Sequence, residues 1–172
     1  GTEVAKDAAD IILTDDNFAT VVDAVSVGRS VFKNVKKAVT YLLTCNVGEV
    51  LSVFFALLLW DVSPLSAMQL LLINLVTDGL PGLALGTYKQ ESDVMKELPR
   101  RKSETFFSQG AGTTVVLGGI SFGVATLVAF MLGNALGYGE ACTMAYLVLS
   151  VSQLVFAAFM RSSKGLFGKG FT

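Results

Sequence analysis

Four long stretches of almost uncharged residues constrain this chain more than any other feature. They cover residues 38–60, 66–86, 110–132 and 142–160. Between them they contain only two charged side chains, Glu49 and Asp78. A helix needs ~20 mostly apolar residues to cross the hydrocarbon core of a bilayer. The four stretches therefore predict an all-α bundle of four transmembrane helices and exclude a water-soluble globular domain.

The composition excludes several other classes of protein. Only 16% of the residues are charged, whereas soluble domains carry about a quarter. Hydrophobic residues make up 52% of the chain, which excludes intrinsic disorder. With no His and two Cys, this chain alone can assemble neither a zinc cluster nor a disulfide framework.

The basic residues predict how the four spans are oriented. All thirteen Lys and Arg residues lie before the first span, in the connection 87–109 or after the last span. The two short connections, 61–65 and 133–141, have none. Cytoplasmic loops carry such an excess of basic residues. We therefore expect an integral, multi-pass protein with both ends of this chain in the cytoplasm.

The residues before the first span predict a short cytoplasmic segment and a stalk. In residues 1–17 we expect a helix from Glu3 to Ala9 and a brief buried strand over residues 11–13, followed by Asp16 or Asn17 as a helix N-cap. No proline occurs from residue 18 to residue 63, so one helix can run through a stalk (18–37) into the membrane, its polar part standing ~30 Å above the bilayer. The alternative is an interfacial amphipathic helix with a break near Lys37.

The two acidic residues inside the spans are expected at one depth. Glu49 lies eleven residues before Trp60, and Asp78 lies twelve residues after Ser66. At 1.5 Å of rise per residue, both carboxylates come close to the middle of a ~30 Å core. Acidic residues at that depth are costly, so they usually face the bundle interior and serve a transport path.

The polar neighbours of these acids predict an oxygen-rich cation site. Asn46 lies on one face of its helix with Glu49. Asn74, Thr77 and Asp78 share a face of the next span, and the fourth span offers Gln153. Carboxylate, amide and hydroxyl oxygens suit Ca²⁺ and do not suit soft metals. The competing interpretation is ordinary hydrogen bonding between membrane helices.

Three further features are interpreted structurally. Pro81 removes a backbone donor and clashes with the carbonyl of Thr77, so we expect the second span to kink or unwind there. Cys45 and Cys142 are interpreted as ordinary small apolar residues. A third set of residues is expected to form a close helix-packing face, and it consists of Gly118, Gly119 and Gly123.

The motifs around the two acids resemble a known family. Asn46-Val47-Gly48-Glu49-Val50 and Asn74-Leu75-Val76-Thr77-Asp78-Gly79-Leu80-Pro81 resemble the fifth and sixth membrane helices of P-type calcium-transporting ATPases of the sarcoplasmic-reticulum kind. Leu13-Thr14-Asp15-Asp16-Asn17-Phe18 looks like the tail of the family's phosphorylation domain, which makes residues 1–17 an α/β remnant. The resemblance includes Asp93-Val94-Met95 and Pro99-Arg100, and it weakens beyond Thr105, although Thr143-Met144-Ala145 fits the eighth helix.

The resemblance implies a set of calcium ligands. The residues that match the family's ligands are Asn46, Glu49, Asn74, Thr77 and Asp78. Asp78 would be shared between two ion sites. Gln153 stands where the sarcoplasmic kind has a glutamate. Without that carboxylate, the calcium affinity of the first of the family's two ion sites is open to question, and so is the binding of two ions. Other parts of the family's machinery are expected outside this chain. They are the fourth-helix glutamate, the phosphorylated aspartate, the nucleotide-binding domain, the actuator domain and the last two spans.

Together these observations predict the membrane ion-binding portion of an ATP-driven pump that moves Ca²⁺ out of the cytoplasm, with H⁺ counter-transport as an added hypothesis. Spans 38–60, 66–86, 110–132 and 142–160 would be family helices 5 to 8, and 161–172 a cytoplasmic tail. ATP and Mg²⁺ would act only in the full-length parent. The expected partners are the parent's other domains and the lipid bilayer, and nucleic acid is not expected. If the source is bacterial, the bilayer would be the plasma membrane. Two alternatives remain: a same-family pump for Na⁺ or Mn²⁺, and a non-enzymatic four-span channel or partner subunit.

Overall fold

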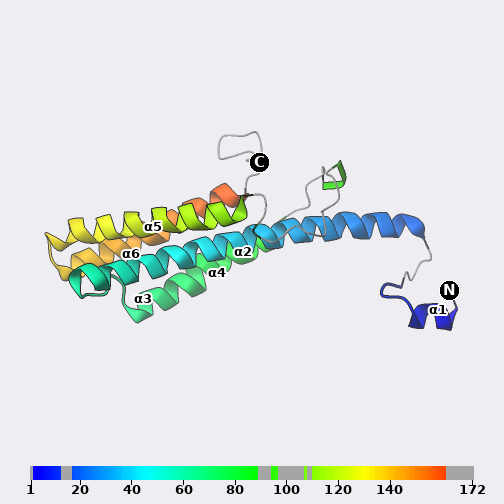
Figure 1. The fold of residues 1–172 in the computed structure, drawn as a ribbon, viewed down its shortest axis with the longest axis horizontal. Coiled ribbons are helices and arrows are strands. Elements are labelled where there is room, and N and C mark those ends of the chain that lie inside the picture. The colour runs from blue at the N-terminus through cyan, green and yellow to red at the C-terminus, as the bar shows by residue number, and fades with distance from the viewer. Residues whose placement is uncertain (1, 13–16, 89–93, 97–106, 108–109, 162–172) are drawn as a thin grey trace.

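The computed structural model describes residues 2–12, 17–88, 94–96, 107 and 110–161. In these residues it contains helices and no strand. The elements are α1 (Glu3–Asp7), α2 (Phe18–Trp60), α3 (Ala67–Leu72), a π-helical turn η1 (Ile73–Asp78), α4 (Gly79–Gly86), a 3₁₀ turn η2 (Val94–Lys96), α5 (Ala111–Asn134) and α6 (Tyr138–Arg161) (Figure 1).

The longest element is α2, which joins the stalk and the first span in one helix. Asn17 caps its start, where the side-chain Oδ1 accepts a hydrogen bond from the Ala19 N–H at 3.0 Å. The helix ends at Asp61, whose left-handed conformation has φ 54°. At 1.5 Å per residue, the 43 residues of α2 extend for about 65 Å. The helix continues without a break through Lys37, as the predicted stalk requires, and the alternative with a break near Lys37 is wrong.

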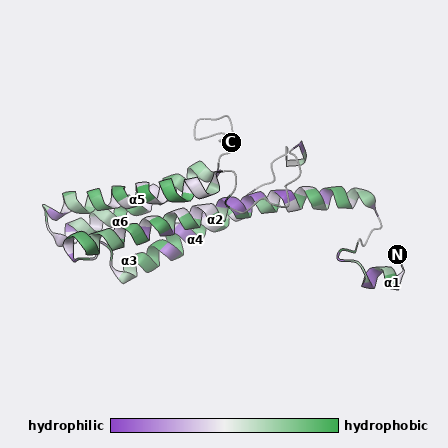
Figure 2. Cartoon of the chain, viewed as in Figure 1, coloured by the Kyte–Doolittle hydropathy of each residue, from purple (hydrophilic) through white to green (hydrophobic). Residues whose placement is uncertain are grey.

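Within the described part of the chain, four helical segments are long and apolar enough to cross a membrane, which confirms the predicted bundle. They are α2, the continuous helical run Ala67–Gly86, α5 and α6. α5 and α6 pack against each other and against α2, and α4 packs on both α2 and α6. The half of α2 that precedes the bundle extends beyond the other helices (Figure 1). Hydrophobic residues dominate the bundle, whereas polar residues are more frequent along the stalk (Figure 2).

The end of the bundle remote from the stalk is formed by two tight turns. The α5–α6 connection is shorter than predicted, because Tyr138–Ala141 are already helical and only Ala135–Gly137 remain between the helices. Gly137 makes this possible with a φ of +144°, which side chains rarely permit. The Tyr138 hydroxyl donates a hydrogen bond of 2.8 Å to the Ser63 carbonyl in the α2–α3 turn. The two turns are therefore tied together.

Glycines allow α2 and α5 to approach closely, as predicted. A Cβ added at Gly118 would lie 2.5 Å from Thr44 Cγ2, and one at Gly119 would lie 2.8 Å from Val47 Cβ. Gly48 makes the reciprocal contact on α2, where a Cβ would lie 2.7 Å from Phe122 Cβ. Small residues at such interfaces permit the close van der Waals packing that holds membrane helices together.

Two apolar clusters fill the bundle interior. The outer cluster, on the side of the short turns, contains Leu65, Ile73, Phe130, Ala141, Ala145 and Leu149. The inner cluster, on the side of the stalk, contains Tyr41, Cys45, Leu85 and Ala157. Large apolar side chains such as Leu58, Leu75 and Leu132 are more than half exposed on the outside of the bundle. An apolar surface of this kind is suited to lipid tails.

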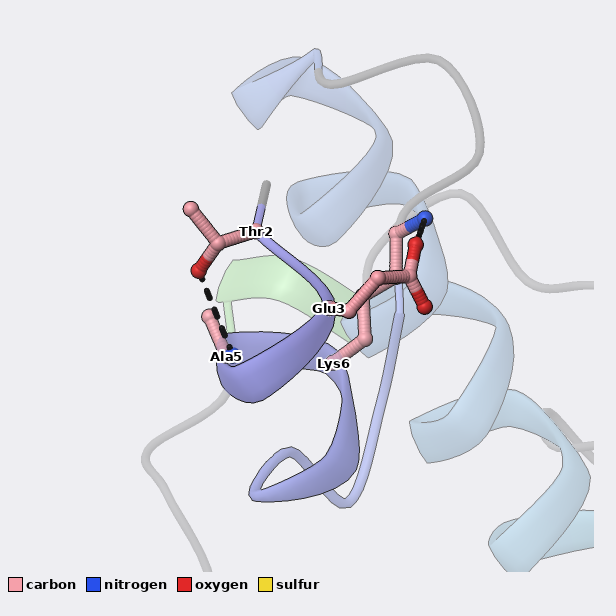
Figure 3. A network of polar contacts seen from close by, with 4 residues as sticks. All are labelled: Thr2, Glu3, Ala5 and Lys6. Carbon is pink, nitrogen blue, oxygen red and sulfur yellow. Dashed lines mark hydrogen bonds and ion pairs between the residues drawn. The ribbon is translucent and has the colours of Figure 1, made fainter.

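The segment before the stalk differs from the sequence prediction. Helix α1 is capped by Thr2 and carries an ion pair between Lys6 and Glu3 at 2.9 Å (Figure 3). The predicted buried strand is wrong where it can be checked, since Ile11 and Ile12 are exposed and lie in no strand. A strand needs a neighbouring strand for its backbone hydrogen bonds, and the described residues supply none. Leu13 and Asp16 lie outside the described residues.

A contact between three helices marks the junction of stalk and bundle. The Asn34 side-chain amide on α2 donates a 2.8 Å hydrogen bond to the carbonyl of Tyr88, which follows α4. The Arg161 guanidinium at the end of α6 stacks 5.3 Å from the Tyr88 ring centroid. Most of the predicted loop 87–109, including Asp93, Pro99 and Arg100, and the tail 162–172 lie outside the described residues.

Candidate cation site

Three helices bring their polar side chains together around Glu49. Glu49 is 5% exposed on α2. Its Oε2 accepts a 3.0 Å hydrogen bond from the Asn74 side-chain amide on η1. Its Oε1 accepts a 3.0 Å hydrogen bond from the Gln153 side-chain amide on α6. The predicted convergence of these residues at one depth is therefore found in the structure.

The second carboxylate lies at the same level and has an unusual environment. Asp78 is 1% exposed. Its neighbours include Glu49, Cys45 and Tyr41. Neither of its two oxygens has a hydrogen-bond partner among the described residues. Carboxylates buried without a partner are strongly unfavourable, and coordination of a cation is one of the few ways to stabilise them.

The acidic side chains alone are too few to coordinate a metal ion at this site. Among the described residues, no group of three His, Cys, Asp or Glu side chains is placed to hold a metal ion. A cation bound between Glu49 and Asp78 would therefore need neutral oxygens to complete its coordination. Amide and hydroxyl oxygens of that kind are offered by Gln153, Asn74 and Thr77, and Gln153 Oε1 is buried without a partner in the described part of the chain.

The backbone beside Asp78 forms a π-helical turn, so the α-helix is wound less tightly there, in the direction of the kink or unwinding predicted from Pro81. Pro81 cannot donate a hydrogen bond to the Thr77 carbonyl. That carbonyl instead accepts a 2.9 Å hydrogen bond from the Tyr41 hydroxyl. The widened turn brings Gly79 so near Asn74 that a Cβ at Gly79 would lie 3.4 Å from the Asn74 carbonyl oxygen. The helix thus remains continuous, and single-turn π-helices of this type are frequent at functional sites.

The other predicted ligands are placed differently from one another. Thr77 is 7% exposed and belongs to the π-helical turn. Asn46 is exposed, and its amide donates a 2.7 Å hydrogen bond to the Leu42 carbonyl of its own helix. Residues three apart differ by about 60° around a helix, so the burial of Glu49 leaves Asn46 at the edge of the buried face. The structure does not bring the Asn46 side chain to the other five predicted ligands.

Two residues near the site were not among the predicted ligands. Tyr41 and Cys45 are both 0% exposed on α2. The sequence alone indicates only a small apolar residue at Cys45, whereas in the structure Cys45 neighbours the Asp78 carboxylate. The signal was present in the sequence, because Tyr41, Cys45 and Glu49 are spaced at i, i+4 and i+8 and therefore share one face of the helix.

We expect Tyr41→Phe to destabilise the protein by about 1–2 kcal/mol, because it leaves the buried Thr77 carbonyl without a donor. Thermal unfolding of the purified protein in detergent measures the effect. The matched control is Tyr146→Phe, since Tyr146 is part-buried and makes no hydrogen bond through its hydroxyl within the described residues. Equal stability of the two variants would show that the Tyr41 hydroxyl does not hold the π-helical turn.

Comparison with known proteins identifies the family. The model of the family described as "Cation transporting ATPase, C-terminus" matches residues 62–172. A calcium-transporting ATPase 1 of Bacillus cereus is 42% identical over 189 aligned residues, which cover 99% of this chain and 21% of the relative. A calcium-transporting ATPase of Listeria monocytogenes is 43% identical, with coverage of 99% and 20%.

A plant protein is also similar to this chain. The endoplasmic reticulum-type calcium-transporting ATPase 3 of Arabidopsis thaliana is 44% identical over 131 residues, which cover 76% of this chain and 13% of the relative. The chain spans about a fifth of the length of the bacterial relatives. Its four apolar helices and its buried polar site thus correspond to the last part of much longer proteins. The chain belongs to the cation-transporting ATPase family, and it is a C-terminal membrane portion of such a protein.

Proposed function

We propose that this chain forms the ion-binding membrane part of an ATP-driven calcium pump. The observation that carries the proposal is the pair of buried carboxylates, Glu49 and Asp78, at the centre of a bundle whose predicted spans contain no Lys or Arg. The printed names of the relatives, which call them calcium-transporting ATPases, favour the same function.

The chemistry of the site supports Ca²⁺ as the transported ion. Ca²⁺ takes 6–8 oxygen ligands in flexible geometry. Glu49 and Asp78 balance the charge of one such ion, and neutral oxygens of Asn74, Thr77 and Gln153 complete its coordination. For this the Asn74 and Gln153 amides, whose nitrogens donate to Glu49 in the structure, turn their oxygens to the ion. Asn46 joins this set only if its side chain leaves the Leu42 carbonyl. Na⁺ and Mn²⁺ also accept oxygen ligands, so transport of either ion is the second candidate.

The continuous helix α2 supplies a mechanism for coupling. The first part of α2 forms the stalk, and Glu49 lies in the later part of the same helix, within the bundle. A rotation of cytoplasmic domains can therefore be transmitted along one rigid element to the ligands. The parent's other domains would bind ATP and Mg²⁺, and both ends of this chain would face the cytoplasm. The acids can carry H⁺ back after Ca²⁺ leaves, since a protonated carboxyl does not bind the ion.

Glu49→Gln tests this function in sealed inside-out vesicles that contain the complete parent protein. We expect ATP-dependent ⁴⁵Ca²⁺ uptake to fall at least about tenfold, because the variant removes one of the two ligand charges. Glu140→Gln is the control, since Glu140 is an exposed acid at the start of α6. We expect this control to retain uptake.

Three further outcomes decide between the candidates. Full uptake in Glu49→Gln would contradict the proposed site. Wild-type vesicles that accumulate ²²Na⁺ or ⁵⁴Mn²⁺ in preference to ⁴⁵Ca²⁺ would support the second candidate, and ion flux without ATP hydrolysis would support a channel.

A pH-sensitive dye inside the vesicles tests H⁺ counter-transport. Calcium uptake without a change of internal pH would exclude counter-transport.

A further inference from the structure

Three aromatic rings form a layer at the end of the bundle remote from the stalk. Trp60 is the last residue of α2, and its ring centroid lies 6.0 Å from that of Phe130 on α5. The Phe130 ring in turn meets the ring of Tyr138 on α6 edge to face, with centroids 6.3 Å apart. Aromatic pairs at such distances attract each other. Side chains of α2, α5 and α6 are thus in contact at this end.

Polar contacts join the same layer to the turn that follows α2. The Tyr138 hydroxyl donates a hydrogen bond of 2.8 Å to the Ser63 carbonyl. The Cys142 thiol, one turn further along α6, contacts the same carbonyl at 4.0 Å. Within the turn, the Ser63 hydroxyl donates to the Leu65 carbonyl at 2.7 Å, and Leu65 is 2% exposed. The outer end of α2 is therefore held against the α5–α6 hairpin by rings and by hydrogen bonds.

The stalk end of α2 is held differently. The stalk half of the helix extends beyond the other helices (Figure 1). Where it meets the bundle, Asn34 bonds the carbonyl of Tyr88, which follows α4. Helix α6 reaches Tyr88 there through the exposed side chain of Arg161, whose length lets it adapt to small shifts. A movement of the stalk is therefore transmitted to α4 more directly than to α6.

A close contact between α2 and α5 lies beside the cation site. A Cβ at Gly48 would lie 2.7 Å from Phe122 Cβ, and one at Gly119 would lie 2.8 Å from Val47 Cβ. If the outer end of α2 were unattached, a push on the stalk would tilt the helix about this contact. Glu49 follows Gly48 directly and would then stay almost in place. Coupling through α2 therefore depends on where its tilt is centred.

A tilt centred at the outer end displaces Glu49 enough to change its contacts. Glu49 lies ~16 Å from Trp60 along the helix axis, and Phe18 lies ~63 Å from Trp60. A sideways movement of ~4 Å at Phe18 therefore becomes ~1 Å at Glu49. The hydrogen bonds from Asn74 and Gln153 to Glu49 are both 3.0 Å long, and such bonds extend to ~3.2 Å. A shift of this size breaks them.

We propose that Tyr138 is a positioning residue that holds the outer end of α2 as the pivot of this movement. The stalk then displaces Glu49 relative to Gln153, because α6 carries both Gln153 and Tyr138 and is held at the same pivot. Gly119 presents no side chain that would block a small slide of α2 across α5. This inference deepens the proposed function, on which it rests, and adds no ligand to the site.

Tyr138→Phe removes the hydrogen bond to Ser63 and keeps the ring against Phe130. In sealed inside-out vesicles that contain the complete parent protein, we expect the number of ⁴⁵Ca²⁺ ions moved per ATP to fall roughly twofold. Hydrolysis of ATP that depends on Ca²⁺ should be retained, since every predicted ligand is intact. Tyr138→Ala also removes the ring and is expected to lower the ratio further. A contact that merely stabilised the fold would lower the melting temperature and leave this ratio at the wild-type value, and that result would overturn the proposal.

Two controls separate a lost pivot from other causes. Tyr146→Phe removes a hydroxyl that makes no hydrogen bond within the described residues, from a ring packed against the outer cluster. We expect its ratio of ions to ATP to equal that of the wild type, and a fall as large as that of Tyr138→Phe would contradict the pivot. Vesicles preloaded with ⁴⁵Ca²⁺ and given no ATP test for a leak. Faster efflux from Tyr138→Phe vesicles than from wild-type vesicles would also count against the pivot.

Distances between site-specific spin labels test the pivot without measuring calcium. Labels at Met68 and Leu136, both 74% exposed, report on the two turns, and a label at Val27 reports on the stalk. When ATP is added to the wild-type protein, we expect the Met68–Leu136 distance to stay constant while the Val27–Leu136 distance changes. Equal changes in both distances, or a change in neither, would overturn the pivot. If wild-type vesicles take up no Ca²⁺, the proposed function fails, whereas normal uptake with moving outer turns removes the pivot alone.

Discussion

Asp78→Asn is expected to abolish high-affinity Ca²⁺ binding. Asp78 is 1% exposed, and neither carboxylate oxygen has a hydrogen-bond partner in the described part of the chain. The substitution removes one of the two charges proposed to bind the ion, and it places an amide N–H where the proposed site would coordinate a cation. Ligand charge count strongly tunes calcium affinity. We therefore expect the apparent affinity to fall by more than about a hundredfold, equivalent to ~2.7 kcal/mol or more.

Equilibrium ⁴⁵Ca²⁺ binding to the purified parent protein measures this loss. The matched control is Asp61→Asn, which removes an equal charge from an exposed turn. Asparagine tolerates the left-handed conformation of Asp61, at φ 54°, so the control should fold and bind normally. Melting temperatures separate loss of the ligand from loss of the fold. Unchanged affinity in a folded Asp78→Asn variant would remove Asp78 from the site.

Gly119→Ala is expected to destabilise the protein by about 2–3 kcal/mol. The added Cβ would lie 2.8 Å from Val47 Cβ and 3.4 Å from the Gly48 nitrogen. These atoms belong to the body of α2 and not to the end of a flexible side chain. The helices must therefore separate, and because Glu49 follows Gly48 directly, we expect calcium affinity to fall as well.

Gly112→Ala on the same helix is the control for Gly119→Ala. A Cβ at Gly112 would make only ordinary contacts, the nearest at 3.6 Å from Phe107 Cβ. Alanine favours a helix over glycine by roughly 0.5–1 kcal/mol, so this variant should be as stable as the wild type or slightly more stable. Thermal unfolding of both variants decides. If both keep wild-type stability, close packing of α5 on α2 does not support the bundle.

The sequence was sufficient to predict the four apolar helices, the continuous helix that runs from residue 18 to residue 60, and the position of the two acids at one level of the bundle. Each of these follows from axial distance, because hydrophobic length and a rise of 1.5 Å per residue determine how far along a helix a residue lies. Glu49 and Asp78 could therefore be assigned to one level without any tertiary information. The contacts that join Glu49 to Asn74 and Gln153 agree with that assignment.

Features that depend on rotation about a helix axis were harder to predict. Asn46 shares an approximate face with Glu49, yet it lies at the exposed edge of the buried surface. The π-helical turn could not be foreseen, because the Pro81 signal shows only that a backbone bond is missing at Thr77. Which group satisfies that carbonyl depends on Tyr41, a residue of another helix.

The most direct test of the proposed cation site is an anomalous difference map of the complete pump with bound Ca²⁺. We expect a peak within about 2.3–2.6 Å of a carboxylate oxygen of both Glu49 and Asp78, the usual range for calcium–oxygen bonds. The Gln153 side chain should lie in or next to the coordination sphere. A calcium peak in the membrane region that contacts neither carboxylate would contradict the account.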